Sequence, residues 1–126
     1  MPCSKSLLLL LLYDVIPFMK KANTDKVITD FSSQVRKVLG SKLVAIYWFG
    51  SRARGDGTPE SDYDLLLETR GTPLENDRDA VADVAVDISA ETGALLDIHY
   101  RTTETLSQES AKSPFIVTIL RDAVLA

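Results

Sequence analysis

The chain has 126 residues, of which 45% are hydrophobic and 25% charged, and its formal net charge is −4. These values fit one globular domain with its own core, and they exclude a disordered, collagen-like or coiled-coil chain. The acidic balance argues against nucleic-acid binding, which relies on clustered Lys and Arg to neutralise phosphates. The sequence has one cysteine and one histidine, which excludes an internal disulfide and a Cys/His zinc site and indicates a cytoplasmic protein.

An apolar leader precedes the predicted domain. Residues 7–12 are all leucine, but Asp14 and Pro17 interrupt an apolar run that falls short of the roughly 20 residues of a membrane span. The basic start and the small-residue cleavage site of a signal peptide are also missing. We expect no membrane contact, leave the status of residues 1–18 open, and assign residues 19–126 to a single domain. The leader is either upstream sequence or an arm that packs on a partner.

The domain is predicted to begin with a helix over residues 24–39 and a buried strand over residues 43–49. Thr24 is the candidate N-cap of the helix, and Gly40 follows its last turn. Apolar residues at helical spacing form the inward side of the helix: Val27, Ile28, Phe31, Val35, Val38 and Leu39. The strand is short, apolar and rich in β-formers.

Three further helical patterns alternate with two strands. A short helical turn at 52–54 and a glycine-rich loop lead to a strand over 63–68. Thr72 is predicted to cap the next helix, with Pro73 at its first position, and Gly93 to end it. The third strand covers 94–100, and the last helix covers 113–125, with an inward side of Ile116, Ile119, Leu120 and Ala123.

The predicted element order is therefore α-β-α-β-α-β-α, which indicates an α+β fold with a small mixed sheet covered by helices. The connection over residues 50–62 is short for a parallel crossover. We therefore expect the first two strands to run antiparallel.

Acidic residues mark the second and third strands. Asp62 and Asp64 are two residues apart, so they share a strand face with Tyr63 opposite. Adjacent carboxylates repel each other unless a cation lies between them, and carboxylate oxygens are the ligands that Mg²⁺ prefers. Asp97 lies between apolar residues of the third strand, and it completes the cluster if that strand lies next to the second. His99 shares the face of Asp97, although a lone strand histidine is more often structural.

A turn suited to phosphate follows the first strand. Gly50 lets a phosphate approach the backbone, and Ser51 offers a hydroxyl at the start of a short helix. Arg52 and Arg54 could add positive charge near the phosphate or could be ordinary surface residues. The turn and the acidic cluster together suit a metal–triphosphate complex.

These residues resemble a known family. Gly50-Ser51, then ten residues, then Asp62-x-Asp64 is similar to the signature of the DNA polymerase beta-like nucleotidyltransferase superfamily. The wider strings, Gly50 to Gly55 and Ser61 to Leu65, look like its minimal nucleotidyltransferase (MNT) branch.

The resemblance implies transfer of a nucleotide from an NTP, with ATP as the expected donor, to an acceptor hydroxyl. Asp62, Asp64 and Asp97 would be catalytic and would hold two Mg²⁺ ions, while Gly50 and Ser51 would hold phosphates. The minimal branch often pairs with a helical HEPN-type toxin and adds AMP to a tyrosine of that toxin. We therefore expect a HEPN-type partner, a toxin–antitoxin role and a homo- or hetero-oligomer.

Two other functions remain open at this stage. The chain could be a non-catalytic antitoxin that neutralises its partner by contact, through the leader or the C-terminal helix. It could also modify RNA with an acceptor domain on another chain, which the acidic charge disfavours.

Overall fold

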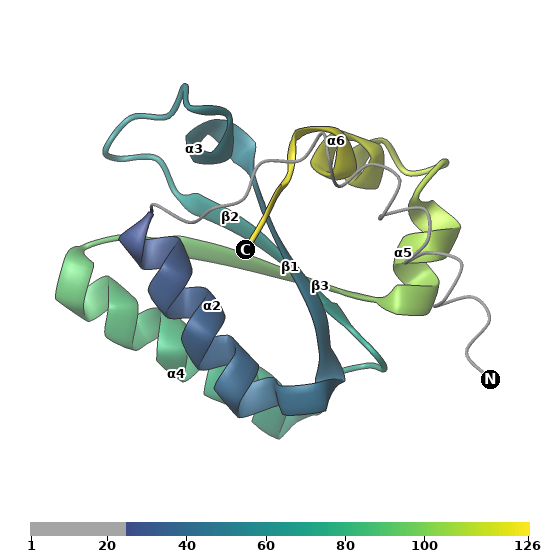
Figure 1. Cartoon of the computed structure of the whole chain (residues 1–126), viewed down its shortest axis with the longest axis horizontal. Helices are drawn as coiled ribbons and strands as arrows, with labels where there is room; N and C mark the ends of the chain where they lie inside the picture. The colour runs from purple at the N-terminus through teal and green to yellow at the C-terminus, as the bar shows by residue number, and fades with distance from the viewer. Residues whose placement is uncertain (1–24) are drawn as a thin grey trace.

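The computed structural model describes residues 25–126. A four-stranded sheet lies between two pairs of helices and has the strand order β3-β2-β1-β4 (Figure 1). The strands are β1 (Leu43–Phe49), β2 (Tyr63–Thr69), β3 (Leu96–Thr102) and β4 (Val124–Leu125). The helices are α2 (Lys26–Leu39), α3 (Gly50–Arg54), α4 (Glu75–Thr92), α5 (Thr103–Glu109) and α6 (Pro114–Asp122), with the 3₁₀ turn η2 (Gly40–Lys42) after α2. None of these helices is long and apolar enough to cross a membrane.

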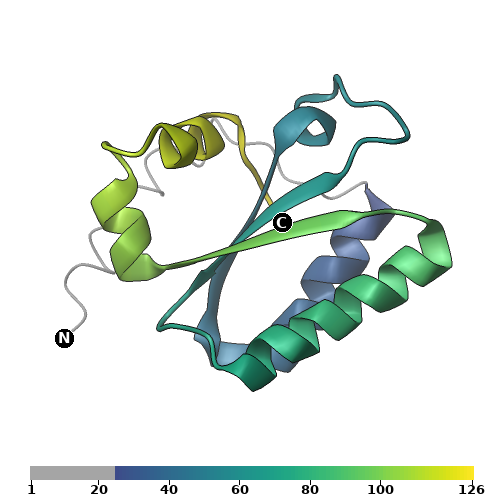
Figure 2. The same cartoon turned by 180° about the vertical axis from the view of Figure 1, so that it is seen from behind.

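The sheet is mixed, as the sequence predicts. β1 and β2 pair antiparallel, and β2 and β3 pair in parallel. The helix α4 makes the crossover between the two parallel strands (Figure 2). This arrangement confirms the predicted α+β class, and it puts the third strand next to the second.

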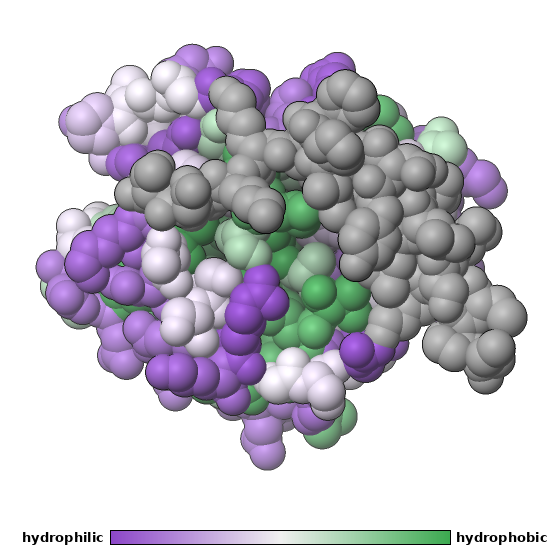
Figure 3. All heavy atoms as spheres, viewed as in Figure 1, coloured by the Kyte–Doolittle hydropathy of each residue, from purple (hydrophilic) through white to green (hydrophobic). Residues whose placement is uncertain are grey.

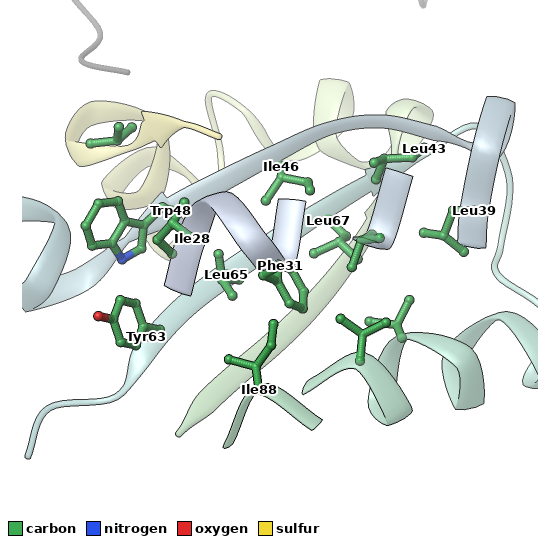
Figure 4. Close-up of a cluster of buried hydrophobic side chains, with 14 residues drawn as sticks. Ile28, Phe31, Leu39, Leu43, Ile46, Trp48, Tyr63, Leu65, Leu67 and Ile88 are labelled. Atoms are coloured by element: carbon green, nitrogen blue, oxygen red, sulfur yellow. The ribbon is translucent and has the colours of Figure 1, made fainter. Parts of the chain in front are cut away.

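One face of the sheet packs against α2 and α4. Phe31 of α2, Leu65 and Leu67 of β2, and Ile88 of α4 meet there with almost no exposed surface (Figure 4). Hydrophilic residues cover the outward side of α2 (Figure 3). Burial of these apolar side chains is the main stabilising contribution on this face.

The opposite face packs against α5 and α6 and includes a buried carboxylate. Tyr47 and Leu66 meet Ile116 and other apolar residues of the two helices. Glu68 is fully buried, and it accepts hydrogen bonds from the Tyr47 hydroxyl at 2.9 Å and from the Thr103 hydroxyl at 2.7 Å. The two donors offset the cost of burying the carboxylate.

The start of α2 differs in detail from the prediction. Thr24 and the leader lie outside the described residues, and Asp25 is the N-cap, its carboxylate accepting from the Ile28 amide at 3.2 Å. Val38 is 43% exposed, so its predicted inward position is wrong. The buried stripe is centred on Ile28 and Val35, and Val38 lies outside its edge.

The predicted cap of α4 is also wrong. The helix has Leu74, not Thr72, as its N-cap residue, and Pro73 therefore precedes the helix. The Asp77 carboxylate accepts from the Leu74 amide at 3.1 Å. This side chain satisfies an amide that would otherwise lack a partner, so the helix starts two residues later than the Thr72 cap predicts.

The C-terminal part contains two elements that the sequence analysis did not predict. The polar stretch after β3 forms α5, and the Thr102 hydroxyl caps it by accepting from the Thr105 amide at 3.1 Å. The last helix ends at Asp122 rather than at Leu125, because the backbone turns extended at Ala123. The following two residues pair with β1 as β4.

Candidate active site

Three side chains form a row across the sheet on the face that α6 covers. Phe49 of β1 pairs with Asp64 of β2, and Asp64 pairs with Asp97 of β3. Register partners on neighbouring strands point to the same face. The structure therefore brings the Asp64 and Asp97 carboxylates side by side.

The acidic charge gathers around Asp64. Burial raises the pKa of the Asp64 carboxyl above its ordinary value, and the negative charges of Asp97 and Asp62 raise it further. His99 and Arg54 act in the opposite direction with smaller effects. Asp62, exposed just before β2, is thus near enough to Asp64 to influence its ionisation. The negative charge is only partly compensated by protein cations.

The turn after β1 lies in close contact with the Asp64 side chain. Gly50 has φ of 86°, which favours glycine, and a Cβ placed on it would lie 2.1 Å from the Asp64 Oδ2. Any side chain at this position would displace the carboxylate. Ser51 follows, half-buried, in the first turn of α3. The Gly-Ser turn and Asp64 therefore form one compact unit.

The donor set suits Mg²⁺ by its chemistry. Asp64 and Asp97 present carboxylate oxygens on one face, and burial, followed by the charge of Asp97, raises the pKa of Asp64. Within residues 25–126, no group of three or more His, Cys, Asp or Glu side chains is already arranged to hold a metal ion. The acidic side chains can therefore contribute ligands, but they do not form a closed cage in this conformation.

The comparison with protein families decides the identity of the domain. Residues 32–124, most of the chain, match the family model described as a nucleotidyltransferase domain. The chain belongs to this family. The nucleotidyltransferase fold and enzyme class predicted from the Gly50-Ser51 and Asp62-x-Asp64 motifs are thereby confirmed.

Other proteins are similar to this nucleotidyltransferase. "Putative protein adenylyltransferase MJ0141" from Methanocaldococcus jannaschii is 29% identical over 82 residues, which cover 64% of this chain and 83% of that protein. The structure "Crystal structure of the toxin-antitoxin with AMP-PNP" has a TM-score of 0.48 and 18% identity, covering 74% of this chain and 69% of the other. "Structure of putative minimal nucleotidyltransferase" has a TM-score of 0.47 and 23% identity, with 82% and 98% covered. Both TM-scores are low, and neither likeness adds to the family assignment.

The two arginines of the nucleotidyltransferase motif have different surroundings. Arg52 donates to the backbone oxygens of Ser61 at 2.6 Å and Pro59 at 2.7 Å, and its guanidinium lies 4.4 Å from the Tyr63 ring centre. It holds the loop between α3 and β2. The Arg54 Nε lies 3.4 Å from the Asp56 Oδ2, and the charge of Arg54 makes a small contribution that opposes the raised pKa of Asp64. Arg54, unlike Arg52, thus has an electrostatic influence on the Asp64 carboxyl. Phosphate binding by either arginine stays a prediction.

Sequence reasoning missed Phe49 and Phe115, two aromatic residues that lie with His99 beside the carboxylates of the nucleotidyltransferase. His99 does reach Asp97, with 3.3 Å between Nε2 and Oδ2. Its ring centre also lies 5.9 Å from that of Phe49 and 5.5 Å from that of Phe115. Strand alternation could have placed Phe49 on the face of Asp64. No local pattern could have brought Phe115 of α6 to the same point.

Proposed function

We propose that this nucleotidyltransferase transfers AMP from ATP to a hydroxyl group of a partner protein, with Mg²⁺ as its cofactor. The observation that carries the proposal is the position of Asp64. Asp64 lies beside its register partner Asp97 on the neighbouring strand, and its carboxylate lies against the turn at Gly50. Such a cluster attracts a hard cation, and glycine at position 50 lets the backbone of the turn lie close to the carboxylate, so that phosphates carried by the cation can meet the backbone there. The adenylyltransferase name of the M. jannaschii relative supports ATP as the donor.

Each residue has a role in the proposed reaction. Gly50 and Ser51 would bind the β- and γ-phosphates, with Arg52 and Arg54 as further candidates, and Asp62, Asp64 and Asp97 would hold two Mg²⁺ ions. Bound Mg²⁺ would neutralise charge on the reacting phosphate. Asp97 accepts the proton of the acceptor hydroxyl. The acceptor oxygen bonds to the α-phosphorus, the bond from that phosphorus to the bridging oxygen breaks, and pyrophosphate leaves.

The proposed acceptor is a tyrosine of a helical HEPN-type toxin in the cytoplasm. The support for this choice is the resemblance of residues 50–65 to the minimal branch, together with the net charge of −4, which suits a protein acceptor better than RNA. In this role the chain is an antitoxin that acts by covalent modification.

The test uses ATP labelled on the α-phosphate, Mg²⁺, and the helical product of a neighbouring gene. We expect the label to move to the partner and pyrophosphate to appear in equal amount, whereas ATP labelled on the γ-phosphate leaves the partner unlabelled. Asp64→Asn should abolish the transfer, and the matched control Glu60→Gln, on the exposed loop, should retain it. Stable binding of the partner without any transfer of label contradicts the proposal.

A second candidate is neutralisation by contact alone. The chain around α4 exposes three large apolar side chains: Leu74 at 63%, Val86 at 64% and Leu95 at 59%. Such residues can take part in a protein interface. If neutralisation of the partner survives Asp62→Ala with Asp64→Ala but not Val86→Asp, contact is the function.

A further inference from the structure

Three aromatic rings meet beside Asp64 and Asp97, on the same face of the sheet. Phe49 comes from β1, His99 from β3 and Phe115 from the first turn of α6. The ring centres are 5.9 Å apart for Phe49 and His99, 6.1 Å for Phe49 and Phe115, and 5.5 Å for His99 and Phe115. The rings meet at angles of 48° to 85°, which are tilted and edge-to-face contacts. We call these three residues the aromatic cluster.

The aromatic cluster has accessible surface next to Asp97. Phe115 is 40% exposed, and the His99 and Asp97 side chains are 33% and 54% exposed. The neighbouring helix residues Ile116 and Ile119 are buried and fill the core beneath. Phe115 is therefore not needed to close the core, and part of its ring remains available to another molecule.

The aromatic cluster also carries a direct link to one carboxylate. His99 Nε2 lies 3.3 Å from Asp97 Oδ2, while the turn at Gly50 contacts the other carboxylate, Asp64. The phosphate turn thus follows Phe49 and contacts the middle carboxylate of the row, while His99 contacts the carboxylate at its β3 end. An aromatic group bound against the exposed parts of His99 and Phe115 would therefore lie beside the residue that contacts Asp97.

We propose that Phe49, His99 and Phe115 form a subsite for the aromatic side chain of the acceptor, with the acceptor hydroxyl directed to Asp97. The inference rests on the proposed transfer to a protein hydroxyl and names the residues that select a phenol over an aliphatic hydroxyl. A phenol ring adds to the cluster by edge-to-face contacts, each of which strengthens binding by about two- to tenfold. A serine or threonine hydroxyl has no ring to occupy this surface.

The only histidine of the chain makes the proposal measurable without turnover. In protein labelled with ¹³C-histidine, the ring signals of His99 are followed by NMR while N-acetyl-tyrosinamide is added. We expect a saturable shift from the ring current of the phenol, and none from N-acetyl-serinamide. A shift caused by adenosine but not by the phenol would assign the cluster to the nucleobase and overturn the proposal, as would no shift with either.

Variants in α6 separate a specific ring contact from general packing. Phe115→Leu keeps an apolar side chain without a ring, and we expect it to weaken N-acetyl-tyrosinamide binding about fivefold while ATP affinity stays unchanged. The matched control is Val117→Ala, a residue of the same helix with 41% exposure outside the aromatic cluster. Equal effects of the two changes, or a loss of ATP affinity in Phe115→Leu, would overturn the assignment.

The same measurements distinguish this subsite from the proposed function. If the phenol binds at His99 but no AMP is transferred to the partner, the result supports the subsite and contradicts the proposed transfer. Transfer of AMP with an acceptor KM that Phe115→Leu does not change confirms the transfer and contradicts the subsite.

Discussion

The two faces of the sheet are built from alternate residues of the same strands, but they carry different chemistry. On β2, Tyr63, Leu65 and Leu67 point to α2 and α4 and are almost fully buried. The residues between them form the other face, where Leu66 is flanked by Asp64 and Glu68. One strand thus supplies a continuous apolar surface and a line of acidic positions at the same time.

Two carboxylates of β2 lie beside the core in different surroundings. Glu68 is buried, and hydrogen bonds from Tyr47 and Thr103 satisfy both of its oxygens. Asp64 is only partly buried and makes no such pair with any residue from 25 to 126, and its pKa is raised by burial and by nearby acids. The interior carboxylate is stabilised by its partners, while the one at the start of the strand lies among other acidic side chains.

The largest expected effect is on stability, at the face that packs against α2. Phe31→Ala removes a fully buried ring and should lower the free energy of unfolding by about 3–5 kcal/mol. On the opposite face Phe115→Ala, with 40% of the residue exposed, should cost roughly 1 kcal/mol or less. Urea unfolding monitored by circular dichroism measures both. Equal losses would mean that Phe115 contributes to the core as much as Phe31 does and would contradict its accessible position.

Gly50→Ala should affect catalysis most strongly among backbone changes. The new Cβ displaces the Asp64 carboxylate, and a shift on the order of 1 Å at a reacting site costs roughly a hundredfold in rate. Gly55→Ala is the matched control, because its φ of 87° imposes the same backbone strain with no atom within 4 Å of the added Cβ. AMP transfer is measured for both after their unfolding curves are compared. Similar rates in the two variants would refute the role of the close contact.

Tyr47→Phe tests the buried hydrogen bonds of Glu68. Loss of the hydroxyl leaves one carboxylate oxygen without its donor and should cost about 1–3 kcal/mol of unfolding free energy. Tyr100→Phe, at a half-buried ring of β3, should change stability by roughly 0.5 kcal/mol or less. Chemical denaturation at neutral pH distinguishes the two. A cost for Tyr47→Phe as small as that for Tyr100→Phe would contradict the described pairing.

The same tyrosine should make the fold sensitive to alkaline pH. Burial, followed by the charge of Glu68, raises the pKa of Tyr47 above its ordinary value of 10.0. The unfolded chain loses the phenol proton above that pH and the folded chain retains it, so stability falls as pH rises beyond about 10. The slope is at most about 1.4 kcal/mol per pH unit from this group. Between pH 8 and 11, the free energy of unfolding should therefore fall less with rising pH in Tyr47→Phe than in the original protein.

The smallest expected effect is a gain in stability from Asp64→Asn. The pKa of Asp64 is raised, so its contribution to stability is full below its ordinary value of 3.8 and is lost as pH increases. At pH 7 the substitution should therefore stabilise the fold by a few tenths of a kcal/mol, roughly, because solvent screens much of the repulsion. Mg²⁺ should raise the melting temperature of the original protein and have less effect on the variant. A variant that is less stable at pH 7 would contradict this electrostatic account.

Much of the site could be predicted because it depends on strand alternation and on motif spacing. The period of two put Asp64 on the face opposite Tyr63, and Gly50 marked the end of β1, whereas Asp62 precedes β2 and its shared face with Asp64 stays a prediction. The position of Asp97 depended on strand order, which local sequence does not encode. Phe115 was missed for a related reason, since only the packing of α6 on the sheet brings it to His99.

Helix ends were predicted less well, because several residues compete to satisfy the same terminal amides. Thr72 and Pro73 fit a helix start, but the Asp77 carboxylate serves the Leu74 amide instead. At the other end of the chain the helical pattern continues to Leu125, and pairing of Val124 with Trp48 prevails over it. Both outcomes depend on tertiary contacts of a few residues.

The strand order places Asp64 and Asp97 on strands with different numbers of hydrogen-bonded neighbours. Asp64 belongs to an inner strand that is hydrogen-bonded to a neighbour on each side, and Asp97 belongs to the outermost strand. An outer strand can shift or twist with fewer bonds disturbed than an inner one can. We therefore expect the backbone at Asp64 to stay in place when a ligand binds, and the backbone at Asp97 to move more.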